Sequence, residues 1–275
     1  MVVRITAGVL ADPSKASYGT GFCYAFQFEN GQNVPMVISN KHVLSNRPWL
    51  SFALADTGPD GRRKLGPAID VRISQGTLPV IDHPDPDVDL AMIPLNPLVQ
   101  IAAQQGRTAS TVCLQSNNAL PAAEIVDLHA ASQVLMVGFP NGLMDATNNL
   151  PVVRRGVLAT PLSADYQGRP DFAVDIAAFG GSSGSPVFAF FDGLREQGGS
   201  MVMGGRSFHF IGVLHSGPVM DAQGILVQRP VPTEAVPITQ LMLNIGICAK
   251  ARLIDDFRPA VAQLLGLETL PIAMP

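Results

Sequence analysis

The sequence predicts an all-β protein that ends in a short helix. Its 275 residues include 26 glycines and 23 prolines, so turns punctuate the whole chain. Between these turns lie short segments in which apolar and polar residues alternate, the pattern of half-buried strands. Many short strands and little helix favour a sandwich or barrel architecture. The chain is long enough for one large β domain or two packed halves.

The strand pattern occurs in both halves of the chain, and most of its segments are bounded by Gly, Pro, Asn or Asp. The predicted strands are Val2 to Val9, Gly21 to Phe28, Val34 to Ser39, Trp49 to Ala55, Leu90 to Leu95, Val134 to Phe139, Val152 to Leu158, Phe172 to Ala178, Pro186 to Phe191, Phe208 to Leu214 and Ile225 to Val227. Residues 101–130, with their Gln, Ser and Asn, are predicted to link two β halves. The helix candidate is Ile254 to Leu265, where Asp255 or Asp256 could cap the start and Pro259 fits the first turn.

Charge and hydropathy exclude several classes of partner. The net charge is −4, and Lys and Arg gather only in short groups such as 62–64 and 154–155. Nucleic acid and an anionic membrane surface are therefore not expected as partners. Because no stretch approaches 18 uncharged apolar residues, we expect no membrane span.

The three cysteines, Cys23, Cys113 and Cys248, lie far apart in the sequence. Their spacing fits neither a metal knuckle nor a disulfide framework, and an odd number leaves at least one thiol unpaired. The first residues lack the basic start and apolar core of a secretory signal. We therefore expect a reducing, cytoplasmic location.

The strongest local motif is Gly-Gly-Ser-Ser-Gly-Ser-Pro at residues 180–186. Glycines on both sides of a serine allow backbone conformations that a Cβ forbids. Such a turn can direct N–H groups at one point while exposing the Ser183 hydroxyl, as acyl transfer requires. By itself the motif is equally compatible with a flexible Gly/Ser turn.

A serine nucleophile needs a base, and two residues of the first half fit that need. His42 stands at the end of the apolar run that starts at Val34, and Asp89 opens the apolar run that continues to Leu95. A carboxylate at such a place is costly to bury unless it is paired, and a histidine N–H is a suitable partner. Each residue alone could equally be structural.

The order and spacing of these three residues are more specific than any one of them. His42, Asp89 and Ser183 are separated by 47 and 94 residues, against about 45 and about 93 in the chymotrypsin template. Here the sequence resembles the trypsin-like (chymotrypsin-fold) serine peptidases, in particular the disulfide-poor bacterial type. The resemblance spans roughly residues 15–245. It extends to further motifs at 20–22, 137–140, 153–158, 212–217 and Ala235 to Ile238, the last of which matches the closing strand of the family.

The resemblance implies two six-stranded antiparallel β-barrels. The expected units are 1–120, which carries His42 and Asp89, 121–253, which carries Ser183, and 254–275, the helix and tail. Ser183 would be the nucleophile, His42 the general base and Asp89 the group that orients the imidazole. The backbone N–H groups of Gly181 and Ser183 would form the oxyanion hole. No metal or other cofactor is implied, and the remaining histidines, His83, His129 and His209, are read as structural or surface residues.

Two departures from the family pattern concern folding and activation. Val43 follows His42 where secreted members carry a cysteine, so Cys23 has no obvious disulfide partner. Ser182 stands where zymogen-type members carry the aspartate that receives a new N-terminal amine. We therefore predict that the oxyanion turn is held by other contacts or ordered by a partner or substrate.

Substrate preference is the least determined feature. The resemblance places the base of the specificity pocket at Ala177 and Ala178, which favours small or apolar side chains before the scissile bond. His215 complicates this expectation, because relatives that cut after Glu or Gln use a histidine in this strand as the pocket donor. A gap-free register puts His215 one position later, so it either contacts substrate or stays at the cleft edge; Gly217 would line the same cleft.

Three functions are compatible with these residues. The leading one is an endopeptidase acting on protein or peptide substrates, restricted or controlled by a regulatory protein partner. The 192–206 segment is either a surface for that control or simply a long hairpin loop. The second function is a catalytically silent peptide-binding or regulatory module, and the third is an esterase or acyl transferase.

Overall fold

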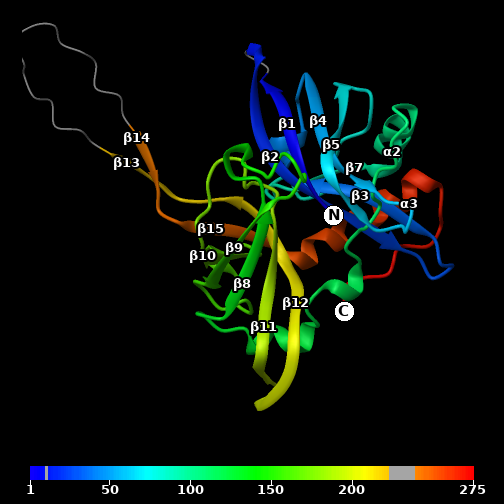
Figure 1. Cartoon of the computed structure of the whole chain (residues 1–275). Helices are drawn as coiled ribbons and strands as arrows, with labels where there is room; N and C mark the ends of the chain where they lie inside the picture. The colour runs from blue at the N-terminus through cyan, green and yellow to red at the C-terminus, as the bar shows by residue number, and fades with distance from the viewer. Residues whose placement is uncertain (10–11, 223–238) are drawn as a thin grey trace, which may run out of the picture.

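Two antiparallel sheets make up most of the molecule (Figure 1). The structure is a computed structural model that describes residues 1–9, 12–222 and 239–275. The predicted class, mostly β with a short C-terminal helix, is confirmed. Two predicted strand segments, Ile225 to Val227 and Ala235 to Ile238, lie outside the described residues.

The N-terminal sheet has seven strands in the order β5-β4-β1-β2-β3-β7-β6. They are β1 (Val2–Val9), β2 (Asp12–Gln27), β3 (Asn33–Ser39), β4 (Trp49–Thr57), β5 (Arg63–Ser74), β6 (Ile81–Asp82) and β7 (Ala91–Pro94). The expectation of six strands is corrected here, because the two-residue β6 pairs with β7 as a seventh strand.

The C-terminal sheet is a closed barrel of six strands, in the order β10-β15-β12-β11-β8-β9. Its strands are β8 (Gln133–Gly138), β9 (Val152–Leu158), β10 (Asp171–Asp175), β11 (Pro186–Gln197), β12 (Ser200–Ser216) and β15 (Ile245–Lys250). Strand β15 pairs with both β10 and β12 and so closes the barrel in the described part of the chain. A separate hairpin, β13 (Val219–Ala222) with β14 (Thr239–Met242), projects away from it (Figure 1).

Residues 192–206 belong to a long two-stranded extension of the barrel. The β11–β12 ladder continues to the pair Gln197 and Ser200, and Gly198 and Gly199 make the turn with positive φ. Figure 1 shows this hairpin extending beyond the barrel. The hairpin interpretation of the segment is therefore confirmed.

The helical content differs from the sequence expectation at one place. Helix α2 (Leu95–Gln104) overlaps the segment that was predicted to be linker. Its buried residues Leu95, Leu98 and Ala102 follow helical spacing, and Pro97 occupies the first turn, where its missing N–H costs nothing. At the C-terminus, the 3₁₀ segment Ala251–Phe257 runs into α3 (Arg258–Leu265), close to the predicted helix.

An apolar cluster joins the two sheets. Phe22 of β2 and Phe210 of β12 pack with ring centroids 5.4 Å apart. The same cluster includes Phe257 and Val261 from the C-terminal helical segments. Burial of this cluster fixes the two sheets against one another, so residues at their facing edges can form one site.

All three cysteines are free thiols, but Cys23 does have a thiol neighbour. Leu114 N–H donates to the Cys23 carbonyl at 2.8 Å, which sets Cys113 beside Cys23. Interaction with Cys113, reinforced by burial, raises the pKa of Cys23, while interaction with Cys23 lowers the pKa of Cys113. From the sequence Cys23 had no obvious disulfide partner, whereas the fold sets Cys113 beside it, with both thiols free.

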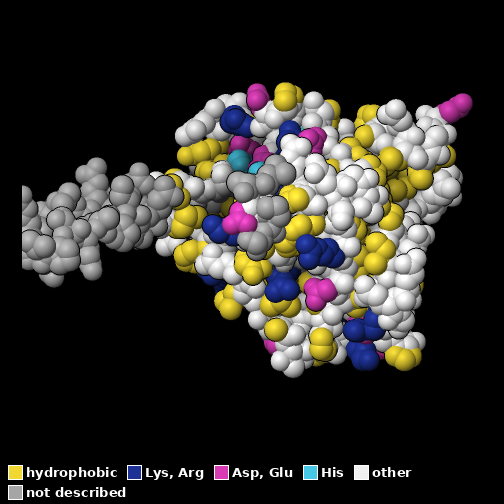
Figure 2. Space-filling model, turned by 90° about the horizontal axis from the view of Figure 1, so that it is seen from above, with side chains coloured by type: hydrophobic (Ala, Val, Ile, Leu, Met, Phe, Trp, Pro, Cys, Tyr) yellow, Lys and Arg dark blue, Asp and Glu magenta, His cyan; other side chains and the backbone are white. Residues whose placement is uncertain are grey.

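Positive and negative side chains are interspersed on the face seen in Figure 2 rather than gathered in one patch. None of the helices in the described ranges has the length and apolarity that a bilayer span requires.

Candidate active site

His42 and Asp89 meet where two neighbouring strands end. His42 lies in the short helix α1 (Lys41–Leu44) directly after β3, and Asp89 lies just before β7. Because Ser39 of β3 is paired with Ala91 of β7, the antiparallel ladder brings the end of one strand to the start of the other. The positions of both side chains thus follow from one strand pairing.

The contact between them is bidentate. His42 Nδ1 lies 2.5 Å from Asp89 Oδ2, and the His42 backbone N–H donates to Asp89 Oδ1 at 3.0 Å. Asn40 Nδ2 donates to the Asp89 carbonyl at 2.7 Å, so the backbone at Asp89 is held as well. The side chain of His42 is 49% exposed and that of Asp89 is 29% exposed. The imidazole is therefore anchored on one nitrogen and open to solvent on its other side.

The electrostatics of the pair favour an ionised carboxylate. Burial opposes ionisation of Asp89, but the hydrogen bonds and charge of His42, with a contribution from His215, outweigh it and lower its pKa. An ionised Asp89 accepts a hydrogen bond from the Nδ1–H of His42, which keeps the ring proton on Nδ1. This leaves His42 Nε2 as the free basic nitrogen.

The turn that contains Ser183, at residues 180–186, follows β10 and leads into β11. Ser182 N–H donates to the Phe179 carbonyl and Ser185 N–H donates to the Ser182 carbonyl, both at 3.0 Å. Ser182 and Ser185 are 1% and 0% exposed, whereas Ser183 is partly exposed. Of the three serines in the motif, Ser183 is the one that a substrate can reach.

Two backbone donors in this turn are left over. In the described part of the chain, neither the Gly181 N–H nor the Ser183 N–H donates to another protein group. The Gly180 carbonyl, which shares a peptide group with the Gly181 N–H, accepts from the Asn141 N–H at 2.5 Å. The Ser182 carbonyl, which shares a peptide group with the Ser183 N–H, accepts from the Ser185 N–H at 3.0 Å. Since the C=O and N–H of a trans peptide point in opposite directions, both free donors point away from these partners. Two such donors two residues apart can stabilise an oxyanion.

A short chain of hydrogen bonds links the turn that contains Ser183 to the strand that precedes His42. Thr20 N–H donates to the Ser183 carbonyl at 2.8 Å, and Ser39 Oγ donates to the Thr20 carbonyl at 2.6 Å. Ser39 is three residues before His42. The described residues contain no hydrogen bond between the His42 ring and the Ser183 hydroxyl; such bonds commonly tighten only when substrate is bound.

Close packing at Gly184 makes this link sensitive to a single methyl group. Gly184 has φ +85°, and a Cβ there would lie 2.0 Å from the Thr20 carbonyl oxygen and 2.4 Å from Ser39 Oγ. We expect Gly184→Ala to abolish measurable catalysis and to reduce the free energy of unfolding. Gly61→Ala is the matched control, because Gly61 has φ +73° with open space around it.

Chemical denaturation of both variants measures the difference. Gly61→Ala should lose only the cost of positive φ, about 1 kcal/mol. Gly184→Ala should lose about 1–3 kcal/mol more, because the collision is with backbone and cannot relax easily. Equal losses in the two variants would show that the turn is not tightly seated on Thr20.

The expected pocket residues lie in different environments. Ala177 is partly exposed, whereas Ala178 is buried in the core of the C-terminal barrel. A Cβ at Gly217 would lie 2.5 Å from the Ile245 carbonyl, so only glycine fits there without a shift. His215 lies at an irregularity in the β12–β15 ladder, between the pairs formed by Leu214 and Ser216.

The His215 side chain is largely buried and contacts the carboxylate of Asp171. Its Nε2 lies 3.4 Å from Asp171 Oδ1, and its side chain is 15% exposed. The bulge explains why counting along the strand could not settle which way this residue faces, since one extra residue reverses the alternation. A charge on His215 also favours the ionised form of Asp89 and so contributes to the low pKa of that carboxyl.

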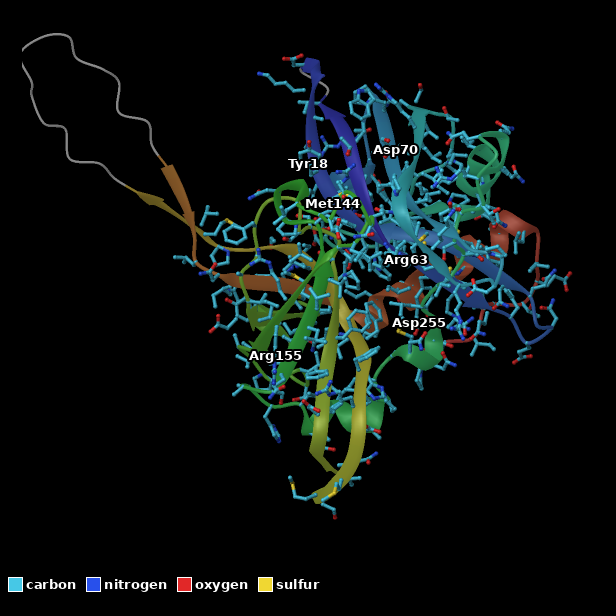
Figure 3. The ribbon with its side chains drawn as sticks, viewed as in Figure 1. Tyr18, Arg63, Asp70, Met144, Arg155 and Asp255 are labelled. Carbon is cyan, nitrogen blue, oxygen red and sulfur yellow. The ribbon has the colours of Figure 1, made fainter. Side chains whose placement is uncertain are left out.

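The loop after β8 completes the surroundings of the turn. It supplies Asn141, and its Gly142 packs on Tyr18 of β2, where a Cβ would lie 3.0 Å from the ring. Figure 3 labels Tyr18 on β2 and Met144 on this loop. Arg154 lies over the ring of Phe179 at 5.0 Å, and both line an open pocket next to the turn. No local sequence pattern marks Tyr18, Asn141 or Phe179 as neighbours of this turn.

Within the described ranges, no group of three or more His, Cys, Asp or Glu side chains is arranged to hold a metal ion. His83 is buried against Leu253 and Asp256 and so has a structural place.

Comparison with known families gives one clear match. A family model described as a trypsin-like peptidase domain matches residues 19–193, more than half of the chain. The comparison with curated proteins gave no match. Among solved structures, the Rv3671c protease of M. tuberculosis in its inactive form is 14% identical, with 98% of this chain and 89% of that chain covered and a TM-score of 0.42.

Two other solved structures are similarly distant. A scabies mite inactivated protease paralogue is 10% identical over 96% of this chain and 94% of that chain, with a TM-score of 0.45. Human heparin binding protein is 13% identical over 99% and 94%, with a TM-score of 0.45. At such distances none of the three bears on the chemistry of this chain.

Proposed function

The chain belongs to the trypsin-like peptidase family, and on that basis we propose that it is a serine endopeptidase with His42, Asp89 and Ser183 as its triad. The observation that carries the proposal is the bidentate contact of His42 with Asp89. Because that contact occupies Nδ1, the His42 Nε2 is available to take a proton from a serine hydroxyl.

The reaction follows from these roles. The Ser183 hydroxyl oxygen attacks the scissile carbonyl carbon while its proton passes to His42 Nε2. The tetrahedral intermediate then breaks its C–N bond, and the imidazolium returns the proton to the leaving amine. Water, deprotonated by the same nitrogen, hydrolyses the acyl-enzyme and restores Ser183. Asp89 stabilises the imidazolium in both halves of the cycle.

Backbone N–H groups stabilise the negative charge on the tetrahedral intermediate. The unpaired N–H groups of Gly181 and Ser183 support an oxyanion hole at this turn. Each such donor is worth roughly 3–4 kcal/mol of barrier in well-studied hydrolases. In this proposal the 1–120 unit supplies the base and the 121–253 unit supplies the nucleophile and the hole, and the substrate lies between them.

The substrate is a peptide or protein. We propose a small or apolar side chain before the scissile bond, with Ala177 at the pocket base and no carboxylate there to favour Lys or Arg. The contact of His215 with Asp171 supports a cleft-edge role for this histidine rather than a donor to a Glu or Gln side chain. The three free thiols support a reducing compartment as the place of action.

Active-site labelling tests the proposal. A fluorophosphonate probe should modify the folded protein, and peptide mapping should locate the adduct on Ser183. Profiling of cleavage sites in a denatured proteome then reports the side-chain preference. Folded protein that neither labels nor cleaves would instead support the alternative, a silent peptide-binding or regulatory module. Faster turnover of simple esters than of any peptide would support an esterase.

A further inference from the structure

Thr20 of β2 is a fully buried polar residue whose hydroxyl and backbone both reach beyond its own sheet. Its N–H donates to the Ser183 carbonyl at 2.8 Å, and its hydroxyl Oγ1 donates to the Gly181 carbonyl at 2.9 Å. The same Oγ1 accepts from the Phe139 N–H at 3.0 Å. Its carbonyl accepts from Ser39 Oγ at 2.6 Å. Four hydrogen bonds thus converge on a residue with 0% exposure.

These bonds fix two peptide groups of the nucleophile turn. In the peptide group that joins Gly181 to Ser182, the carbonyl accepts from Thr20 Oγ1 and the N–H donates to the Phe179 carbonyl. In the peptide group that joins Ser183 to Gly184, the carbonyl accepts from the Thr20 N–H and the N–H donates to the Leu214 carbonyl, both at 2.8 Å. A peptide held at both its polar groups cannot rotate without breaking a bond.

The other two peptide groups of the turn are the ones that carry the free donors. Along the turn, each peptide group with a free N–H lies next to a peptide group whose carbonyl is bonded to Thr20. Rotation of either free N–H would therefore disturb a neighbouring hydrogen bond to Thr20. Of the eight polar groups in the four successive peptides from Gly180 to Gly184, six are paired, and the N–H groups of Gly181 and Ser183 are the two that remain.

No side chain of the turn at residues 180–186 carries a charge, so the turn cannot supply an ion pair of its own. Ser182 occupies the position before the nucleophile, and among the residues that the structure describes its buried hydroxyl has no hydrogen-bond partner. The prediction that other contacts hold the turn therefore has a specific candidate. Thr20 is suited to it because a hydroxyl both donates and accepts, as its bonds to Gly181 and Phe139 require.

We infer that Thr20 is a positioning residue for catalysis: its hydroxyl holds the oxyanion turn in the competent conformation from the opposite sheet. The inference rests on the proposed function, and it adds a residue and a role which that function does not require. Because the turn is fixed from within the chain, the oxyanion hole is formed before substrate binds.

The test compares three variants of the full chain. Thr20→Val keeps the shape of the side chain but can neither donate nor accept. Thr20→Ser keeps the hydroxyl, and Thr6→Val makes the same exchange on neighbouring strand β1, where the side chain has no hydrogen bond to the turn. We expect Thr20→Val to lower kcat by about 10²-fold with little change in KM, because the misplaced donors act only in the transition state. Thr20→Ser should recover most of that loss, and Thr6→Val should behave like the unaltered protein.

Inhibitor binding separates positioning from general damage to the fold. A peptide boronic acid forms a tetrahedral adduct on the nucleophile and needs the oxyanion donors, whereas the matching product peptide does not. Thr20→Val should weaken the boronic acid by the same factor as kcat and leave the product peptide unchanged. If Thr20→Val does not fold, Thr20→Cys replaces it, since a thiol is a much weaker donor and acceptor of similar size.

Each outcome is distinct. An active parent protein with unaltered kcat in the folded Thr20→Val or Thr20→Cys variant would overturn this inference and leave the proposed function intact. Equal weakening of the boronic acid and the product peptide would also overturn it, in favour of a purely structural role. A parent protein that shows no turnover and no boronic acid binding would overturn the proposed function itself.

Discussion

Replacement of Ser183 by alanine is expected to lower kcat by roughly 10⁶-fold, which is the loss found when the nucleophile of a serine peptidase is removed. The physical reason is that no other group at the site can form the acyl-enzyme: Ser182 and Ser185 are buried, and their hydroxyls have no partner in the described part of the chain. The residual rate should stay above that in water, because the oxyanion donors are backbone groups that the substitution leaves in place.

Stability measurements and a second serine provide the control. The Ser183 hydroxyl makes no hydrogen bond within the described residues, so Ser183→Ala should change the free energy of unfolding by no more than about 0.5 kcal/mol. Ser163→Ala, at an exposed serine of the same barrel, should retain full activity. Turnover that persists in Ser183→Ala at more than a hundredth of the parent rate would assign the nucleophile to another residue.

The sequence could predict the parts of this molecule that depend on local pattern. The punctuation by Gly and Pro predicted the β class. The strand that ends before His42 and the one that begins after Asp89 predicted two side chains at one sheet edge, and the structure brings these two together. The glycine-rich turn around Ser183 was visible because positive φ at Gly181 and Gly184 demands glycine.

Contacts between distant segments were not predictable in the same way. Thr20 entered the sequence comparison only as part of the motif at 20–22, and its hydrogen bonds could not be foreseen because its partners lie 119 and 161 residues away. Cys23 and Cys113 are likewise brought together by a parallel bridge at Tyr24 and Leu114 that no local pattern reveals. Helix α2 was different: its apolar spacing was present in the sequence, but polar Gln residues at its end were read as linker.

Substitution of Asp89 by asparagine is the second change with a large expected effect. An asparagine amide that donates to His42 Nδ1 would move the imidazole proton to Nε2, where it blocks transfer from Ser183. We expect kcat to fall by about 10⁴-fold, as the corresponding change does in the chymotrypsin template. Steady-state kinetics on a peptide substrate measures the loss. Asp82→Asn, at an exposed carboxylate of the same sheet, is the matched control and should leave kcat unchanged.

The same substitution has a pH signature in stability. The folded protein lowers the pKa of Asp89, so the unfolded chain binds this proton more readily than the folded one. The stabilisation from this carboxylate is therefore complete above the ordinary carboxyl pKa of about 3.9 and is lost as pH falls through the lower value in the folded state. The free energy of unfolding of the parent should exceed that of Asp89→Asn at neutral pH, and the gap should narrow in acid below about pH 4. A gap that stays constant down to pH 2 would mean that the contact with His42 does not favour the charged form of Asp89, and the argument for an anchored imidazole would then fail with it.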